Sequence, residues 1–392
     1  MSRSPLFSIV VPTRNRPEYV ADCVYSLVHQ TLDDLEVIVS DNSSTTEHAE
    51  ATRNAVAPFL DDNRVSYVRT ERPLPMTQHW NWAVSRARGA YVGIVTDRMA
   101  LRLYTLAAVN EAIQAASDVD AVSFGSCVAK GEAHRFLIPR VDGECTASSL
   151  KSSDTLSAFS RSRMGKNNPR FLNSFCSRDA MSRIQNHYRT LFTGIAPDYA
   201  FLFRYLNLFD TYFHIFHPLL VVQGEERSNG KAFLTGKMNE DSSDFHRRML
   251  QEQAEWLQFG PIPRDTSVLN NIILREYEIG KAEGRPGRFP AIDKTAFYET
   301  AVERAIELNH NGHLGTEARQ ALSAYGRDNK LTLRTIPEAP RGISTVMRAA
   351  ARRVKQLLPA TKGSERLFFD GENMKQVLNA DLASRERIQA SK

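Results

Sequence analysis

Short apolar runs alternate with segments of helical periodicity along the first hundred residues. The run Phe7–Val11 predicts a buried strand that ends at Pro12, because proline lacks the N–H that a central ladder needs. Asn15 is the expected cap of a following helix with Pro17 in its first turn, where a missing N–H costs nothing. One face of that helix is apolar, with residues at helical spacing: Tyr19, Cys23, Val24, Leu27 and Val28.

The same alternation continues to about residue 100. Further strands are predicted at Leu35–Val39, Val65–Val68 and Tyr91–Val95, with helices ending near Ala57 and spanning Thr77–Arg88. Strands that alternate with helices indicate an α/β fold, in which a mostly parallel, Rossmann-like sheet carries helices on both faces. Ligands of such sheets bind at the carboxyl ends of the strands, which here are the stretches Pro12–Arg16, Ser40–Ser44 and Thr96–Met99.

The pattern changes twice farther along the chain. Residues 127–168 are polar and rich in serine, which predicts loops, and regular patterns return with a helix starting at Pro197 and a strand at Tyr212–Val222. From about Asp241 the spacing predicts long amphipathic helices, such as Phe245–Phe259 and Thr295–Leu308. We therefore expect four parts: an α/β core at 5–235, a helical appendage at 240–335, a basic amphipathic segment at 341–364 and a frayed polar tail at 365–392.

Charge is concentrated in one of these parts. The whole chain has 50 basic and 45 acidic residues, a formal charge of +5, which does not suggest a dedicated nucleic-acid binder. Segment 341–364 holds six basic residues and no acid, so the rest of the chain has 44 − 45 = −1. A basic amphipathic helix of this kind binds an anionic membrane surface, although a solvated helix packed on the domain has the same pattern.

Several classes of protein are disfavoured by what the sequence lacks. No apolar run approaches the roughly 20 residues of a membrane-spanning helix, and the first residues do not resemble a secretory signal. The four cysteines form no C-x-x-C pair, so neither a zinc site nor a disulfide framework is suggested. We expect a cytoplasmic protein that also lies peripherally on the inner face of the membrane if segment 341–364 binds there.

Two of the strand ends carry residues suited to a nucleotide. Asp41 can accept hydrogen bonds from a ribose hydroxyl, or it can form an Asx turn without any ligand. In Thr96-Asp97-Arg98, the carboxylate can contribute to a divalent metal site and Arg98 offers a positive fork for phosphate oxygens. Neither G-x-x-x-x-G-K-[ST] nor G-x-G-x-x-G follows the first strand, which disfavours a P-loop NTPase and a standard dinucleotide-dependent dehydrogenase.

Three early segments and one later segment together resemble a known family. They are Phe7-Ser-Ile-Val-Val-Pro-Thr-Arg-Asn-Arg-Pro-Glu-Tyr-Val20, Ser26-Leu-Val-His-Gln-Thr31, Leu35-Glu-Val-Ile-Val-Ser-Asp-Asn-Ser-Ser44 and Asn81-Trp-Ala-Val-Ser-Arg-Ala-Arg-Gly-Ala-Tyr-Val92. In this order and spacing they are similar to the opening of a family 2 glycosyltransferase with the GT-A fold. The resemblance covers about the first 100 residues.

The resemblance implies roles for particular positions. Thr13, Asn15 and Asp41 would hold the base and ribose of a nucleotide sugar, and Asn81 would lie near its diphosphate. Asp97 falls in the D-x-D position of the family, where Mg²⁺ or Mn²⁺ bridges the diphosphate. This sequence departs from the pattern, because Thr96 and Arg98 stand where further carboxylates are usual. Either Arg98 replaces part of the metal's charge or the site is degenerate.

The resemblance also points to a general base. Thr193-Gly-Ile-Ala-Pro-Asp-Tyr-Ala-Phe201 is similar to the region where inverting members carry a carboxylate, and here that carboxylate is Asp198. A Pro-Asp pair is equally typical of a helix start, and the helix N-terminus is expected to lower the pKa of Asp198. The expected function is inverting transfer from a nucleotide-sugar donor to a glycan or lipid-linked acceptor. The alternative is a noncatalytic GT-A protein that binds a nucleotide sugar or glycan.

Overall fold

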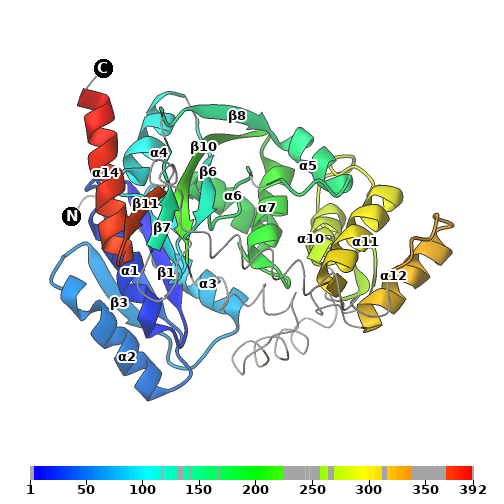
Figure 1. Cartoon of the computed structure of the whole chain (residues 1–392), viewed down its shortest axis with the longest axis horizontal. Helices are drawn as coiled ribbons and strands as arrows, with labels where there is room; N and C mark the ends of the chain where they lie inside the picture. The colour runs from blue at the N-terminus through cyan, green and yellow to red at the C-terminus, as the bar shows by residue number, and fades with distance from the viewer. Residues whose placement is uncertain are drawn as a thin grey trace.

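The computed structural model describes residues 4–116, 118–129, 136–141, 143–165, 167–223, 243, 247, 257–263, 269–310, 316–336 and 368–390. A central sheet with helices on both faces forms one side of the molecule, and the C-terminal helices α10, α11 and α12 lie on the other side (Figure 1). The predicted α/β fold class with a helical C-terminal part is confirmed. Segment 341–364 and most of the predicted helix Phe245–Phe259 lie outside the described residues.

The sheet has nine strands in the order β3-β2-β1-β4-β9-β6-β10-β5, with β8 paired to β10. The strands are β1 (Phe7–Thr13), β2 (Leu35–Asp41), β3 (Val65–Arg69), β4 (Tyr91–Ile94), β5 (Met99–Leu101), β6 (Ala121–Val128), β8 (Ala147–Lys151), β9 (Ser174–Ser177) and β10 (Thr211–Val222). The pairings make β1, β2, β3, β4, β6 and β10 run in one direction, whereas β5, β8 and β9 run against them. The sheet is therefore mostly parallel, as the alternating pattern predicts.

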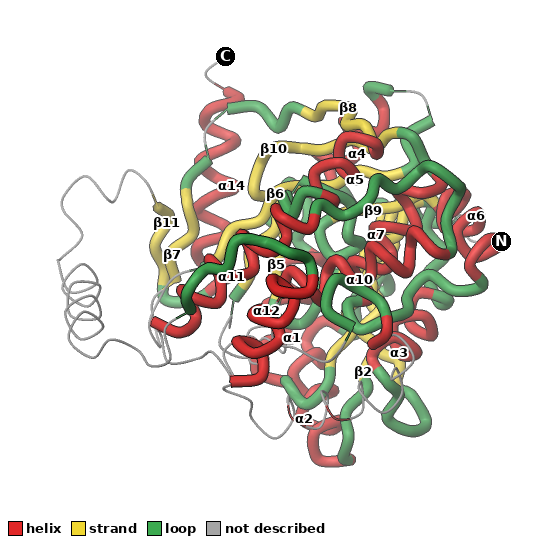
Figure 2. The backbone as a smooth tube through the Cα atoms, turned by 90° about the vertical axis from the view of Figure 1, so that its right-hand side faces the viewer, coloured by secondary structure: helices red, strands yellow, loops and turns green. Residues whose placement is uncertain are grey.

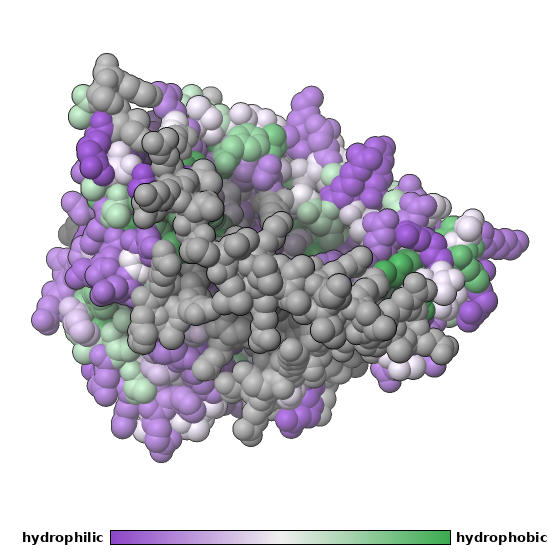
Figure 3. Space-filling model, viewed as in Figure 1, coloured by the Kyte–Doolittle hydropathy of each residue, from purple (hydrophilic) through white to green (hydrophobic). Residues whose placement is uncertain are grey.

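Two core clusters lie on opposite faces of the sheet, as the alternation of side chains along β1 shows. Val10 packs in one cluster, whereas Ile9 and Val11 pack in the other. The helices are α1 (Pro17–Val28), α2 (Thr46–Val56), α3 (Met76–Val84), α4 (Thr105–Gln114), α5 (Ser152–Ser160), α6 (Arg178–Tyr188), α7 (Pro197–Leu208), α10 (Leu269–Ala282), α11 (Lys294–His310), α12 (Thr316–Asp328) and α14 (Met374–Ala390), with a short 3₁₀ turn at Ala57–Phe59. Polar residues cover most of the described surface in the view of Figure 3.

The first strand is longer than the sequence predicts. β1 continues through Pro12 to Thr13, which pairs with Asp41 of β2. The neighbouring ladder between β1 and β4 ends at Val10 and Ile94, so Pro12 lies beyond the point where an N–H toward β4 is needed. Asn15 does not cap α1, because the cap position is Arg16 and no side chain bonds there.

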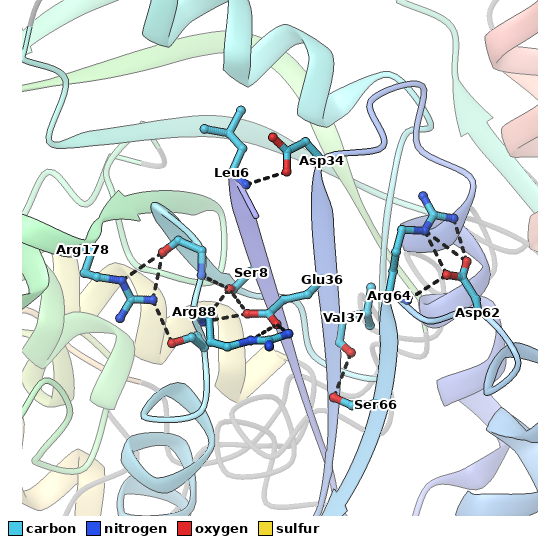
Figure 4. Close-up of polar contacts among 12 residues, drawn as sticks. Leu6, Ser8, Asp34, Glu36, Val37, Asp62, Arg64, Ser66, Arg88 and Arg178 are labelled. Atoms are coloured by element: carbon cyan, nitrogen blue, oxygen red, sulfur yellow. Dashed lines mark hydrogen bonds and ion pairs between the residues drawn. The ribbon is translucent and has the colours of Figure 1, made fainter. Parts of the chain in front are cut away.

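A polar network closes the end of the sheet opposite the predicted binding edge (Figure 4). Ser8 of β1 donates to Glu36 of β2 at 2.6 Å, and the guanidinium of Arg88 donates to the same carboxylate at 2.7 and 2.9 Å. Gly89 donates its N–H to the Ser8 hydroxyl at 2.6 Å, and a Cβ at this glycine would lie 2.6 Å from the backbone nitrogen of Ser8. The close approach of the turn before β4 to β1 thus requires glycine.

Residues 127–168 are more regular than the serine-rich pattern predicts. Their described part contains β7 (Phe136–Pro139), β8 and α5. β8 pairs with the first half of β10, from Thr211 to Ile215, whereas β5 pairs with the last residues of β10. Tertiary pairing with the long strand β10 therefore gives strand structure to a segment whose own sequence is a weak strand former.

The predicted frayed tail instead returns to the core. β11 (Phe368–Gly371) pairs with β7, and α14 lies along α1 at the far side of the sheet from α10–α12 (Figures 1 and 2). Met374, Val377 and Leu378 are buried against residues of β5 and β10 in a separate apolar cluster. No helix in the described parts of the chain is both long and apolar enough to cross a membrane.

Candidate functional site

Three polar side chains meet at the carboxyl ends of β1, β2 and β4. Thr13 ends β1 and lies opposite Asp41, the last residue of β2. The hydroxyl of Thr13 donates to the Oδ2 atom of Asp97, which follows β4, at 2.9 Å. The strand ends selected by the sequence are thus brought together.

Asp97 lies in a buried, positively charged setting. Its side chain is 3% exposed, and the Nη1 atom of Arg16 lies 3.9 Å from its Oδ1 atom. Burial raises the pKa of the Asp97 carboxyl, while Arg16 and the hydrogen bond from Thr13 oppose the rise. Next to it, the Thr96 hydroxyl is buried with no hydrogen-bond partner among the described residues. An acceptor supplied by a ligand would satisfy that hydroxyl.

Asp41 forms the Asx turn that the sequence offers as one of two alternatives. Its Oδ1 atom accepts from the backbone N–H of Ser43 at 2.8 Å and from the Ser43 hydroxyl at 2.6 Å. Its Oδ2 atom accepts from the Tyr67 hydroxyl at 2.6 Å, and burial together with Asp41 raises the pKa of Tyr67. Both oxygens are already engaged, so a ribose hydroxyl would share or displace these donors.

Asn15 joins the loop after β1 to the loop after β2. It has a left-handed backbone with φ of 55°, and its side-chain amide donates to the Ser44 hydroxyl at 2.8 Å. The backbone N–H of Ser44 donates in return to the Asn15 Oδ1 atom at 2.9 Å. Asn15 therefore shapes the predicted base-binding edge through the loop that Asp41 also holds.

Asn81 of α3 is directed at a loop that is distant in sequence. Its amide donates to the carbonyls of Thr77 and Phe192 at 2.8 and 2.9 Å. Its Oδ1 atom accepts from the N–H groups of Leu191 and Phe192, both at 3.2 Å. The bonds to Leu191 and Phe192 hold the chain just before α7, a role that the sequence does not indicate.

Asp198 lies in the first turn of α7, as predicted, and is paired with Arg170. The Nη1 atom of Arg170 lies 3.6 Å from Asp198 Oδ2, and the Asp198 side chain is 17% exposed. The backbone N–H groups at the start of α7 lower the pKa of Asp198, as expected, and Arg170 lowers it too. Burial outweighs both, so the net shift of the pKa is upward, which the sequence does not predict. Phe171, which follows Arg170 in the chain, accepts through its carbonyl from the N–H of Ile94 at the end of β4. This bond places Arg170 near the carboxyl end of β4.

The described residues around Asp97 do not by themselves make up a metal-binding group. Among these residues, no three His, Cys, Asp or Glu side chains come together as a metal-binding group. The Asp97 carboxylate accepts a hydrogen bond from Thr13 and faces Arg16, and Arg98 follows it in the chain. Arg98 donates to the carbonyl of Gln223 at 3.2 Å. Arg16 and Arg98 offer positive charge to a bound phosphate, and Asp97 offers a single carboxylate to a metal ion whose other ligands would be phosphate and water.

Several residues of the site were not selected from the sequence. Arg16 lies within the selected loop Pro12–Arg16 and was missed because a lone arginine near a turn is uninformative. Arg170 and Tyr67 reach the site from other elements, and nothing local to them indicates a partner. Glu276, which accepts from the N–H of Ile195 at 2.7 Å, comes from α10, 81 residues away.

Comparisons with known proteins agree with the resemblance. Residues 8–119 match the family described as Glycosyl transferase family 2. The chain is 35% identical over 92 residues to "Glycosyltransferase GlyG" of Streptococcus pneumoniae, which covers 24% of this chain and 30% of that protein. It is 28% identical over 129 residues to "GalNAc(5)-diNAcBac-PP-undecaprenol beta-1,3-glucosyltransferase" of Campylobacter jejuni, covering 33% of this chain and 40% of that protein. The matches thus span less than half the length of these relatives.

Solved glycosyltransferases show a distant likeness over most of the chain. S. aureus TarS 1–349 in complex with UDP-GlcNAc has a TM-score of 0.44 at 15% identity, covering 85% of this chain and 94% of that one. The mannosyltransferase PcManGT of Pyrobaculum calidifontis, in complex with GDP-Man and Mn²⁺, has a TM-score of 0.42 at 18% identity, covering 91% and 88%.

Proposed function

Residues 8–119 are a glycosyl transferase family 2 domain, and from this premise we propose that the protein transfers a sugar, with inversion, from a nucleotide-sugar donor to an acceptor hydroxyl. The acceptor is a glycan or a lipid-linked sugar in cell-surface polysaccharide or glycolipid synthesis. The basic segment 341–364 would bring the protein to an anionic membrane surface where such acceptors lie.

The observation that carries the proposal is the meeting of Thr13 and Asp97 at the ends of β1 and β4, with a hydrogen bond of 2.9 Å. A nucleotide sugar would lie across these strand ends, with its base toward Asn15 and Asp41. Its diphosphate would lie beside Asp97, where Thr96 has a buried hydroxyl in need of a partner and Arg98 supplies positive charge. Arg16 and Arg98 would stabilise the charge that develops on the leaving phosphate.

Asp198 would act as the general base. Its carboxylate takes the proton of the acceptor hydroxyl while the hydroxyl oxygen forms a bond to the anomeric carbon. The bond from that carbon to the diphosphate breaks, and the nucleoside diphosphate leaves with the electron pair. A single displacement of this kind inverts the configuration. The raised pKa of Asp198 makes it a better base than an ordinary carboxylate, and Arg170 keeps it oriented.

The test compares Asp198→Asn with Asp179→Asn, because Asp179 is an exposed acid in the first turn of α6 and so occupies an equivalent helix position. Nucleotide diphosphates and nucleotide sugars are screened by thermal shift, and hydrolysis or transfer is measured with each donor that binds. Asp198→Asn should keep nucleotide binding and lower turnover about 100-fold or more. Asp179→Asn should behave as wild type, and Asp97→Asn should weaken nucleotide binding.

A noncatalytic role remains the second candidate, because the sequence Thr96-Asp97-Arg98 has a single acid where the family usually has more. Binding of a nucleotide sugar without any turnover, equal in wild type and Asp198→Asn, would support that role against catalysis. Failure to bind any nucleotide would contradict catalysis and also a noncatalytic role that depends on a nucleotide sugar. Adding Mn²⁺ or EDTA to the same screen tests whether nucleotide binding depends on a metal ion at Asp97. We expect nucleotide binding to change little with either.

A further inference from the structure

A buried carboxylate from the C-terminal helices lies against the loop that leads to Asp198. Glu276 of α10 is 1% exposed. Its Oε1 atom accepts from the N–H groups of Ile195 and Ala196 at 2.7 and 3.0 Å. Its Oε2 atom is buried and has no hydrogen-bond partner among the residues that the structure describes. The carboxylate therefore lies at the positive N-terminal end of α7.

A glycine in the loop 193–196 leaves room for the Glu276 carboxylate. Gly194 has φ of 73°, in the left-handed region, and a Cβ added there would lie 2.2 Å from Glu276 Oε2. Glycine is thus required both by the backbone conformation and by the close approach. Ala196 occupies the N-cap of α7 and has no side chain that can bond to the helix end. Glu276 accepts from the N–H groups of this residue and of the one before it, and so fixes the entry of the chain into the helix from another helix.

A local serine at position 196 would cap α7 without burying a charge. Here the chain before α7 is held from α10, which packs on α7 through Phe203 and Tyr277, with ring centroids 5.3 Å apart. Because burying a carboxylate with an unpaired oxygen is costly, the arrangement makes the loop conformation depend on the C-terminal helices. Asp198 follows Ala196 by two residues, so whatever moves the loop moves the proposed base.

We infer that Glu276 is a positioning residue, which holds the loop 193–196 and thereby sets the place of the Asp198 carboxylate. The C-terminal helices are then part of the transferase unit, beyond the matched domain at 8–119. This inference rests on the proposed function of Asp198. It predicts that disturbing Glu276 changes turnover while nucleotide binding at the ends of β1, β2 and β4 is left intact.

The experiment measures hydrolysis of UDP-GlcNAc and GDP-mannose as probes, the affinity for UDP and GDP, and amide exchange in residues 193–198 of the full chain. Glu276→Ala should lower kcat at least tenfold, leave KM and nucleotide affinity within twofold, and speed exchange at Ile195 and Ala196. Glu276→Gln should retain more of kcat than Glu276→Ala, because its amide oxygen still accepts from the two N–H groups.

Gly194→Ala is a second, independent disturbance, and it carries the test if Glu276→Ala does not fold. It should lower kcat in the same way. Its matched control is Gly287→Ala, where φ is 76° but nothing lies within 4 Å of the added Cβ. Gly287→Ala thus has a similar backbone strain without contact to the Glu276 carboxylate, and it should keep the wild-type kcat.

The outcomes separate the inference from the proposed function. If Asp198→Asn is inactive while folded Glu276→Ala or Gly194→Ala has the wild-type kcat, the positioning role is wrong and the base assignment stands. A fall in nucleotide affinity parallel to kcat would also overturn the positioning role. If Asp198→Asn keeps full activity, the base assignment is wrong and the inference falls with it.

Discussion

Burial raises the pKa of three acidic side chains: Asp97, Asp198 and Glu276. It raises the pKa of Asp97 and of Asp198, although each carboxylate has an arginine beside it. It raises the pKa of Glu276 to about 7, against the two backbone N–H groups that favour the charged form. Charge at these residues is therefore stabilised less well in the folded protein than in water, and this makes both their chemistry and the stability of the fold depend on pH.

We predict that Glu276 makes the stability of the fold depend on pH. Its ordinary pKa is 4.5 and its folded value is about 7, so the folded protein binds the proton more tightly than the unfolded chain. The stability that this group contributes is then fully present below pH 4.5 and is lost as the pH rises through 7. The difference between the two values corresponds to on the order of 3 kcal/mol.

Urea unfolding of wild type and Glu276→Gln at pH 5 and pH 8 measures this effect. The glutamine variant does not titrate at this position, so the wild type should lose stability relative to it as the pH rises. A difference between the two proteins that stays constant from pH 5 to pH 8 would show that the Glu276 carboxyl titrates normally.

At the scale of elements, the helix α3 and the loop before α7 are joined by one side chain. Asn81 accepts from the N–H groups of Leu191 and Phe192 and donates to the Phe192 carbonyl. Glu276 holds the next residues of the same loop from α10. The segment 191–196 is thus fixed from two sides, by the matched domain and by the C-terminal helices.

We predict that Asn81→Ala lowers the free energy of unfolding by about 2 kcal/mol, because it leaves the N–H groups of Leu191 and Phe192 without the acceptor that they share. The loss of turnover should exceed any loss of nucleotide affinity. Urea unfolding and UDP or GDP binding measure the two effects. Ser85→Ala is the control on the same chain segment, since its exposed hydroxyl makes a single bond to the Trp82 carbonyl. Equal effects of the two variants would contradict the role of Asn81.

For the whole molecule, the chain leaves the sheet after β10, forms the C-terminal helices and returns beside the sheet as β11 and α14 (Figure 1). A buried ion pair holds α14 against the sheet. Arg102 Nη1 and Asp381 Oδ2 lie 2.6 Å apart, and the two side chains are 0% and 4% exposed. Arg102 also donates to the carbonyls of Pro218 and Pro139. One side chain thus connects α14 with β10 and β7.

Removing one partner of this pair should be strongly destabilising. We predict that Asp381→Ala costs about 3–5 kcal/mol, because Arg102 is left charged and buried. The double variant Arg102→Met with Asp381→Leu should be less destabilised than Asp381→Ala, since no unpaired charge remains. Urea unfolding measures both. Glu303→Gln, which removes an exposed pair with Arg334, is the control and should have little effect. A double variant no more stable than the single one would argue against a penalty from unpaired charge.

The sequence by itself determined the alternation of strands and helices, the three strand ends of the site and the helix start at Asp198, because periodicity and turn residues are local signals. It also carried the family resemblance. Only the tertiary structure decided that Asp41 is held by Ser43 and Tyr67, that Asn81 serves the loop before α7, and that the tail returns to the core. The same holds for Glu276 and for the sign of the pKa shift at Asp198. These depend on burial and on contacts between residues far apart in the chain, which no local pattern records.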